Sequence, residues 1–199
     1  PSAHLKQPTN GADYILITIA DFLPVVQPLL ERRAQQGLRV TAIDVEDIYN
    51  EFGFGAPTPQ SIKNFLTYTY QHWQPPAPSY VLLLGDATLD YKGYLNSNKK
   101  LNLIPAYLVP TVYSLAPTDN WYVSIQGEDS LPDMMIGRLP SHSVEQVRTL
   151  VDKILNYEAN SNLSPTMLAV ADNDPSFEAA SDEAIKLVPS NIAISQVYL

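Results

Sequence analysis

Short apolar runs alternate with amphipathic stretches along the chain, and the most compact run covers residues 80–84. This run is continuous rather than alternating, which is typical of a strand buried on both faces in the middle of a parallel sheet. It ends at Gly85 and Asp86. Because ligands and catalytic groups collect at the carboxyl ends of strands in open α/β sheets, we expect Asp86 to lie at the functional edge.

The stretches before this run predict two strands and three helices. The strands are residues 13–19 and 38–43, and the helices are residues 22–36, 45–52 and 59–73. Asp21 is suited to cap the first helix, and Thr58 followed by Pro59 marks the start of the third. The resulting βαβαβ order predicts an α/β fold: a three-layer, doubly wound, mostly parallel sheet with right-handed crossovers.

The stretches after Asp86 extend this pattern. The polar residues 87–102 predict a long loop, and such loops at a strand's carboxyl end are more often functional than not. Residues 118–123 and 133–138 predict two strands in a small antiparallel excursion. The last predicted elements are helices at 143–157 and 181–188 and strands at 167–171 and 192–199.

Composition narrows the classes of partner. The net charge of −9 argues against a nucleic-acid partner, whose phosphates would be repelled. The absence of cysteine excludes disulfides, thiolate metal sites and a cysteine nucleophile within these 199 residues. No apolar run is long enough for a membrane span. The chain does not begin with Met, so we expect a longer protein, with residues 1–12 as an entry arm and residues 13–199 as a subdomain.

Acidic side chains near predicted strand ends are the main candidates for chemistry. Asp86 and Asp172 follow predicted strands, Asp174 is close behind, and Asp119 lies in the excursion. Carboxylates gathered at one edge could orient a histidine, bind a divalent cation or stabilise a cationic substrate. The alternative is structural, because an aspartate after a strand often caps the next helix or accepts from local amides.

Arg138, at the end of the second strand of the excursion, has two interpretations. Its guanidinium could bind a substrate carboxylate. We favour the other interpretation, in which it pairs with Asp119 or Asp133 and holds the excursion in place.

Three further kinds of site are disfavoured by spacing. The histidines fit no metal motif and are expected on the surface: His4, His72 and His142. A dinucleotide site would need a glycine-rich turn after the first strand, which is missing. A receiver-like module with Asp86 as phosphoacceptor would need an acidic pair at the end of the first strand, where Asp21 stands alone.

An ordered series of motifs resembles the gingipain-like cysteine peptidases, peptidase family C25. The series is VLLLGD (81–86), DY (90–91), IPAY (104–107), PTDNWYV (117–123), PDMMIGRLP (132–140) and VDKILNYE (151–158), followed by VADNDPSF (170–177). The resemblance covers the chain from about residue 13 to its end.

The resemblance implies a caspase-like α/β fold made of two side-by-side subdomains. In that family the nucleophilic cysteine and the histidine, in a Gly-His-Gly context, lie in the second subdomain. This chain has no cysteine and no such motif, so it resembles the N-terminal subdomain alone. The expected function is therefore the N-terminal part of a cysteine endopeptidase whose Cys and His lie beyond residue 199. The alternative is a non-catalytic binding or assembly module of a secretion or surface system.

The resemblance also implies roles for individual residues. Asp172, or Asp174 if the alignment shifts by two, would orient the catalytic histidine. Asp182 or Glu183 would match the acidic residue that binds a basic substrate side chain. Gingipains bind calcium in surface loops, but no ligand set can be assigned here, so metal sites are left unknown and no cofactor is required.

The same resemblance implies the partners and the location. The expected partners are the second subdomain of the same parent chain and a peptide or protein substrate. The sheet edge that would meet the second subdomain could also support a dimer. The expected location is extracellular or on the cell surface.

Overall fold

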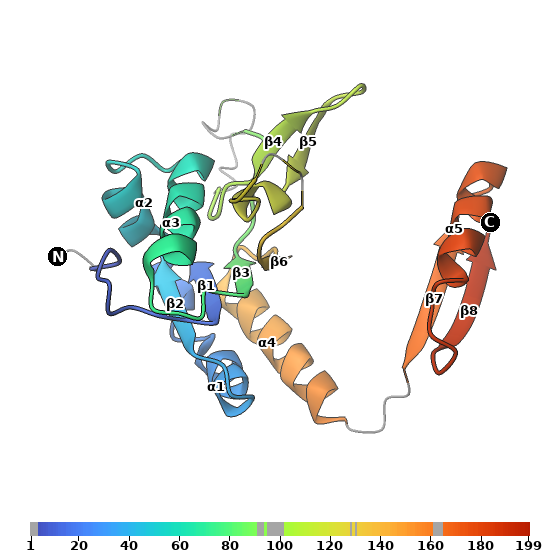
Figure 1. Ribbon diagram of the computed structural model, residues 1–199, viewed down its shortest axis with the longest axis horizontal. Helices are drawn as coiled ribbons and strands as arrows, with labels where there is room; N and C mark the ends of the chain where they lie inside the picture. Colours follow the sequence, from blue (N-terminus) through green and yellow to red (C-terminus); the bar gives the residue numbers. More distant parts are fainter. Residues whose placement is uncertain (1–3, 91–93, 95–101, 128, 130, 161–164) are drawn as a thin grey trace. The chain divides into compact units, whose positions relative to one another are not determined.

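The computed structural model describes residues 4–90, 94, 102–127, 129, 131–160 and 165–199. The chain divides into two compact units, residues 1–155 and 156–199 (Figure 1). Most of the predicted loop at 87–102, and parts of the turn at 126–129, lie outside the described residues. None of the described helices is long and apolar enough to cross a membrane.

The first unit is built on a four-stranded parallel sheet with the strand order β2-β1-β3-β6. The strands are β1 (Tyr14–Thr18), β2 (Val40–Asp44), β3 (Tyr80–Leu84) and β6 (Met135–Leu139). β1 and β3 are central, so the continuous apolar run at 80–84 does form an interior strand. The prediction of a mostly parallel α/β sheet is confirmed.

Helices cover both faces of this sheet (Figure 1). On one face, α2 (Val45–Phe52) and α3 (Pro59–His72) pack against Ile15, Ile17 and Leu83. On the other face, α1 (Gln27–Gln35) and α4 (Val144–Ala159) pack against Leu16 and Leu84. Successive side chains of a strand point to opposite faces, so burial of both faces requires the apolar run to be continuous.

Proline decides where two of these helices begin. Thr58 accepts from the N–H of Ser61 and Pro59 opens α3, as expected. The prediction for residues 22–36 is wrong at its start, because residues 20–22 form a short 3₁₀ turn and α1 begins only at Gln27. Pro28 lies in the first turn of α1, where its missing N–H costs no helical hydrogen bond, and Asp21 does not cap the helix.

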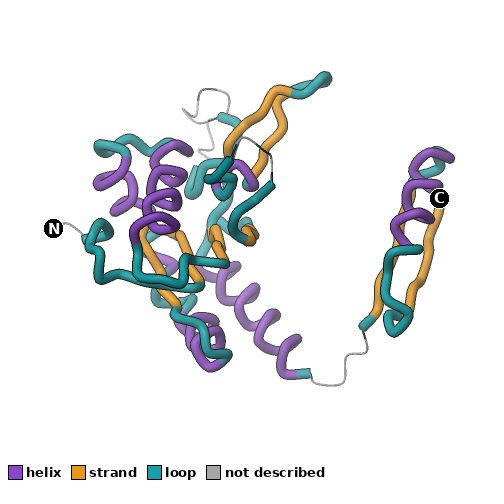
Figure 2. The backbone as a smooth tube through the Cα atoms, in the orientation of Figure 1, coloured by secondary structure: helices purple, strands orange, loops and turns teal. Residues whose placement is uncertain are grey.

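The antiparallel excursion lies earlier in the chain than predicted. It consists of β4 (Tyr107–Pro110) and β5 (Leu115–Thr118), which pair antiparallel (Figure 2). Residues 120–122 form a 3₁₀ turn instead of a strand, and β6 joins the parallel sheet beside β3. The prediction of pairing between residues 118–123 and 133–138 is therefore wrong, because the second stretch pairs in parallel with the buried strand at residues 80–84.

The second unit contains β7 (Thr166–Ala171), α5 (Pro175–Ile185) and β8 (Ala193–Tyr198). The two strands pair in parallel, in register from Thr166 with Ala193 to Ala171 with Tyr198. The helix begins six residues earlier than predicted, because Asp174 and Pro175 form its start. Asp174 accepts from the N–H of Ser176 and Pro175 opens the helix, the same cap pattern as Thr58-Pro59.

The described part of the predicted arm is fastened to α2 and α3. Leu5 is 7% exposed and joins the core on that face of the sheet. Its N–H donates to Glu51 Oε2 and its carbonyl accepts from Trp73 Nε1, both at 3.0 Å. Tyr68 also donates to the carbonyl of Lys6 at 2.8 Å. The arm therefore forms a fixed wall of the first unit rather than a free tail.

An ion pair joins the amino ends of β1 and β2. Arg39 Nη2 donates to Asp13 Oδ1 at 2.7 Å, and the backbone N–H of Arg39 donates to Oδ2 at 2.8 Å. The side-chain hydrogen bonds of Arg39, reinforced by its backbone N–H, lower the pKa of Asp13 below its ordinary value. The pair thus fixes the register at which the two strands enter the sheet.

We expect Asp13→Asn to flatten the acid dependence of stability. A carboxyl whose pKa is lower in the folded than in the unfolded state stabilises the fold above the unfolded pKa, and this contribution is lost as pH falls through the folded pKa. The stability difference between the variant and the wild type should therefore be greatest at neutral pH and should shrink below roughly pH 4. Urea unfolding at several pH values measures it. Asp21→Asn is the control, and a difference that stays constant with pH would contradict the assignment.

Candidate functional site

The carboxyl edge of β3 leads directly into a tight turn. Gly85 has a φ of +151°, and a Cβ at this position would meet Ile104 Cγ1 at 2.7 Å, so the turn requires glycine. Asp86 then accepts from the N–H of Ala87 through Oδ1 at 2.9 Å. Its backbone carbonyl accepts from Leu103 at 3.0 Å. Asp86 therefore lies at the strand end, as predicted, with one carboxylate oxygen engaged locally.

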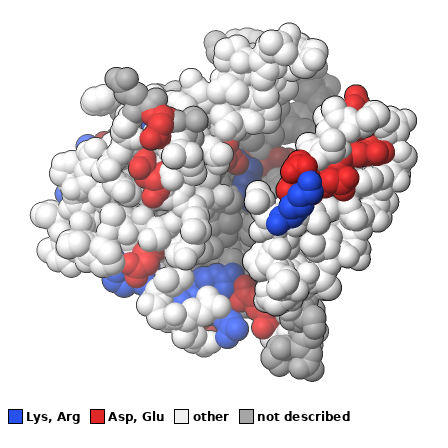
Figure 3. Space-filling model, turned by 45° about the vertical axis from the view of Figure 1, so that its right-hand side comes forward, with Lys and Arg blue, Asp and Glu red and all other residues white. Residues whose placement is uncertain are grey.

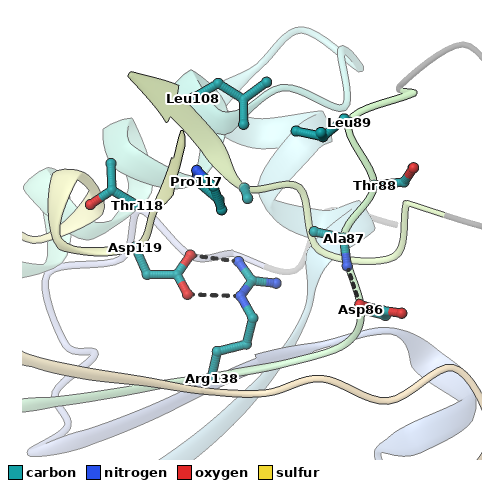
Figure 4. A pocket seen from close by; sticks show the side chains of 10 residues that line it. Asp86, Ala87, Thr88, Leu89, Leu108, Pro117, Thr118, Asp119 and Arg138 are labelled. Carbon is teal, nitrogen blue, oxygen red and sulfur yellow. Dashed lines mark hydrogen bonds and ion pairs between the residues drawn. The ribbon is translucent and has the colours of Figure 1, made fainter. Parts of the chain in front are cut away.

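Arg138, on β6, forms the centre of the site (Figure 4). Nε donates to Asp119 Oδ2 and Nη2 to Asp119 Oδ1, both at 2.8 Å. Nη1 donates to the carbonyls of Gly85 at 2.9 Å and Ile104 at 2.7 Å. Nη2 also donates to the carbonyl of Pro105 at 3.2 Å. All five N–H groups of the guanidinium therefore have acceptors within the chain.

This geometry decides between the two interpretations of Arg138. No donor is left for a substrate carboxylate, so the pairing with Asp119 is confirmed and the substrate clamp is not supported. Asp133 has another role: the N–H of Gln126, together with that of Ile125, holds the pKa of Asp133 below its ordinary value. The Arg138 guanidinium and its five hydrogen bonds, called here the Arg138 fork, connect β6 to the chain that follows β3 and to the turn after β5.

A cavity of about 330 Å³ opens above this ion pair (Figure 4). One wall is formed by the segment from Asp86 to Leu89, and the other by Leu108 and Pro117 of the antiparallel pair. Its walls are largely apolar, while Asp86 and the neutralised Asp119–Arg138 pair supply its polar groups. The cavity lies at the carboxyl edge of the sheet, where the sequence predicted function.

His142 is a neighbour of Asp86 that the sequence did not predict. Its side chain is 64% exposed, so the expected surface position is correct, but Nδ1 lies 4.0 Å from Asp86 Oδ2. Both residues follow adjacent parallel strands, and only recognition of β6 as a neighbour of β3 could have placed them together. Among the residues that the structure describes, no three His, Cys, Asp or Glu side chains are arranged to hold a metal ion.

The second unit separates the roles of Asp172 and Asp174. Asp174 Oδ1 accepts from the N–H of Ser176 at 2.8 Å and from the Ser176 hydroxyl at 2.7 Å. The hydrogen bond from the hydroxyl, followed by the one from the N–H, lowers the pKa of Asp174. Asp172 follows β7 directly, is exposed, and accepts from the N–H of Asn173 at 2.8 Å. Asp174 is therefore engaged as a helix cap, and Asp172 is the more available carboxylate.

Asp182 and Glu183 lie in the last turn of α5 and have different partners. Asp182 Oδ1 accepts from Gln196 Nε2 at 2.9 Å and from the Tyr198 hydroxyl at 2.6 Å, which links the helix to β8. Glu183 pairs with Lys186 at 2.5 Å in an exposed contact. The charged surface visible on this unit is mainly acidic (Figure 3). Both acids are exposed, but Asp182 accepts two hydrogen bonds from β8, whereas Glu183 has the single contact with Lys186.

Comparison with known proteins identifies the family. The model of peptidase family C25 matches residues 7–199. The chain belongs to peptidase family C25. Gingipain R2 of Porphyromonas gingivalis is 28% identical over 156 residues, covering 78% of this chain and 18% of gingipain R2. Gingipain R1 of the same organism is 27% identical over 156 residues, covering 78% of this chain and 13% of gingipain R1. The C25 chain thus spans less than a fifth of the length of these relatives.

Solved structures agree with this assignment. The Arg-specific cysteine proteinase gingipain R (RgpB) superposes with a TM-score of 0.66 at 21% identity, covering 100% of this chain and 43% of that one. The complex of RgpB pro- and mature domains from P. gingivalis gives 0.68 at 23% identity, covering 94% and 42%. Dimeric latent PorU from P. gingivalis gives 0.60 at 21% identity, covering 77% and 17%. At these identities the likeness establishes the fold.

We expect Arg138→Ala to lower the free energy of unfolding by about 2–4 kcal/mol, because it leaves two carbonyls, of Gly85 and Ile104, and the Asp119 carboxylate without their donor. The Pro105 carbonyl keeps its hydrogen bond from the Tyr122 hydroxyl. Asp119→Asn should cost less, since the carbonyl contacts of Arg138 remain. Chemical denaturation of both variants and of the double variant measures the coupling between the two side chains. A loss below about 0.5 kcal/mol for Arg138→Ala would show that the fork does not stabilise this edge.

Proposed function

We propose that this C25 chain is the N-terminal, non-nucleophile part of a cysteine endopeptidase. The observation that carries the proposal is the family match over residues 7–199 of a chain that contains no cysteine. The thiol nucleophile and the catalytic histidine of the parent protein are then supplied by residues outside this chain. The proposed reaction is thiolate attack on a peptide carbonyl, with the histidine as acid and base.

Asp172 is the residue we assign to the support of that histidine. A carboxylate that accepts from the imidazole fixes its tautomer and stabilises the imidazolium formed during attack. Asp172 fits this role because it lies at the carboxyl end of a parallel strand and is exposed. Asp174 fits it less well, since both of its known contacts belong to the start of α5.

A basic side chain on the amino side of the scissile bond is the proposed recognition element. Asp182 and Glu183 are the candidate acids. Glu183 is the more available of the two, because its carboxylate pairs only with Lys186, whereas Asp182 Oδ1 accepts two hydrogen bonds from β8. This proposal is supported by the similarity to a protein described as an Arg-specific cysteine proteinase.

Location and partners are part of the same proposal. The parent protein would act outside the cell or at its surface on peptide or protein substrates. The second subdomain of the same parent chain would be the main partner. The sheet edge that would meet this subdomain is the proposed surface for a dimer. No cofactor is needed for the proposed chemistry, and calcium remains a candidate for structural binding.

Asp172→Ala in the full-length protein should lower kcat/KM by about 10–10⁴-fold, because an uncompensated imidazolium is costly. The pH profile should also shift, since the apparent pKa of the histidine falls when the carboxylate is removed. Asp174→Ala is the matched control: it should lower stability through the lost helix cap and leave the pH profile unchanged. If Asp172→Ala changes neither the rate nor the profile, the assigned role is wrong.

Peptidase activity itself should be tested on the full-length protein with peptides carrying Arg, Lys or a neutral residue before the scissile bond. We expect cleavage that a thiol-reactive inhibitor abolishes, with preference for a basic residue that Glu183→Gln or Asp182→Asn reduces. Absence of cleavage by a folded, processed protein would overturn the enzymatic function in favour of a binding or assembly role.

A further inference from the structure

The outer edge of β2 is open for pairing. Strand β2 lies at one side of the parallel sheet, and its only strand partner among the described residues is β1 (Figure 1). An edge of this kind presents a row of backbone donors and acceptors to whatever lies beside it. Strand β2 has five residues, long enough to pair with a short extended segment.

The register identifies which backbone groups point outward. The N–H of Tyr14 donates to the carbonyl of Arg39 at 3.1 Å, and Tyr14 is paired with Val40. In a parallel ladder alternate residues of a strand bond to the same neighbour, so Thr41 and Ile43 bond to β1. The N–H and C=O groups of Val40 and Ala42, and the N–H of Asp44, therefore face away from β1. Within the described part of the chain, no backbone or side-chain group bonds to them.

A groove runs along this edge. It has a volume of about 510 Å³ and is lined by β2 from Val40 to Asp44, by the arm at Asn10 and Gly11, and by Leu23. The arm is a fixed wall, because Asn10 accepts from the N–H of Gln74 at 2.7 Å and its side chain donates to the carbonyl of Leu5. The open donors and acceptors of β2 thus lie along a groove whose opposite wall is the fixed arm.

Negative charge is concentrated at the carboxyl end of the groove. Asp44 and Asp47 both line it there. Asp44 caps α2 through its bond from the N–H of Glu46, and Asp47 lies in the first turn of the same helix. Burial, with added repulsion from Asp44 and then Glu51, raises the pKa of Asp47. A cation placed at this end would relieve that crowding.

We propose that the β2 edge binds an extended peptide segment that carries a basic side chain, with the backbone paired to Val40 and Ala42 and the cation against Asp44 and Asp47. The segment would add a strand to the sheet, with main-chain bonds supplying affinity and the two acids supplying specificity. A second copy of this chain is a poorer occupant, since its own net charge of −9 opposes approach to an acidic groove.

The proposal is tested by fluorescence anisotropy on the full-length protein after treatment with a thiol-reactive inhibitor, so that the probe is not cleaved. The probe is a fluorescein-labelled peptide, Thr-Val-Thr-Val-Thr-Lys, compared with the same peptide ending in Gln. Ala42→Pro removes a donor that faces outward and costs no bond to β1. It should raise the Kd at least about tenfold, whereas Ala42→Ser, which keeps the N–H, should not.

The acidic end is tested separately. Asp47→Asn should raise the Kd of the Lys peptide roughly threefold to tenfold and leave that of the Gln peptide unchanged. Asp152→Asn, an exposed acid on α4, is the charge-matched control and should change neither value. Equal effects of Asp47→Asn on both peptides would overturn the assigned recognition of a cation.

Three results would overturn the edge itself as the site: no binding of either peptide at millimolar concentration, equal binding by Ala42→Pro and Ala42→Ser, or self-association that Ala42→Pro abolishes. The last result would assign the edge to a second copy of the chain. If Ala42→Pro lowers the melting temperature of the protein, the variant is replaced by a modified peptide. In this peptide alternate backbone amides are N-methylated, and it is tested on the wild-type protein. That probe lacks the donors but leaves the protein unaltered, and undiminished binding of it would also overturn the proposal.

Discussion

Burial of the parallel sheet on both faces is the constraint on which the rest of the first unit depends. Ile15 and Leu16 point to opposite sides of β1 and are both fully covered by helices. No charged side chain can be accommodated there without a large desolvation cost. Polar chemistry is therefore restricted to the ends and the outer edges of the strands. The Asp13–Arg39 pair occupies the amino ends, the Arg138 fork the carboxyl ends, and the acids of the groove the open edge of β2.

The same constraint explains which elements could be predicted from the sequence. The run at 80–84 and the start at Thr58-Pro59 are local signals, and the structure agrees with both. The partner of residues 135–139 is not a local property, because an apolar strand can pair with any exposed neighbour until the whole sheet is assembled. The start of α5 at Asp174-Pro175 is also a local cap signal, although the predicted helix begins six residues later, at residue 181.

The candidate site shows the same division. The sequence predicted that Arg138 pairs with Asp119 or Asp133, and the structure shows that the partner is Asp119. The three carbonyls that complete the fork could not be predicted, since they depend on how the chain leaves β3. The approach of His142 to Asp86 likewise depends on strand order. The sequence thus identifies the charged groups, whereas the order of the strands decides which of them are engaged in structural hydrogen bonds and ion pairs.

This distinction bears on the acids of the second unit. Asp174 stabilises the amino end of α5, where a negative charge is favoured by the helix dipole. Asp182 and Glu183 lie at the opposite end, where the dipole opposes them by about 0.3–1 kcal/mol each. Tyr198 and Gln196 offset the cost for Asp182 with two hydrogen bonds, and Lys186 offsets it for Glu183 with one ion pair. The fold therefore supplies two donors to Asp182 and one to Glu183, so both acids are compensated for a position that the helix dipole disfavours.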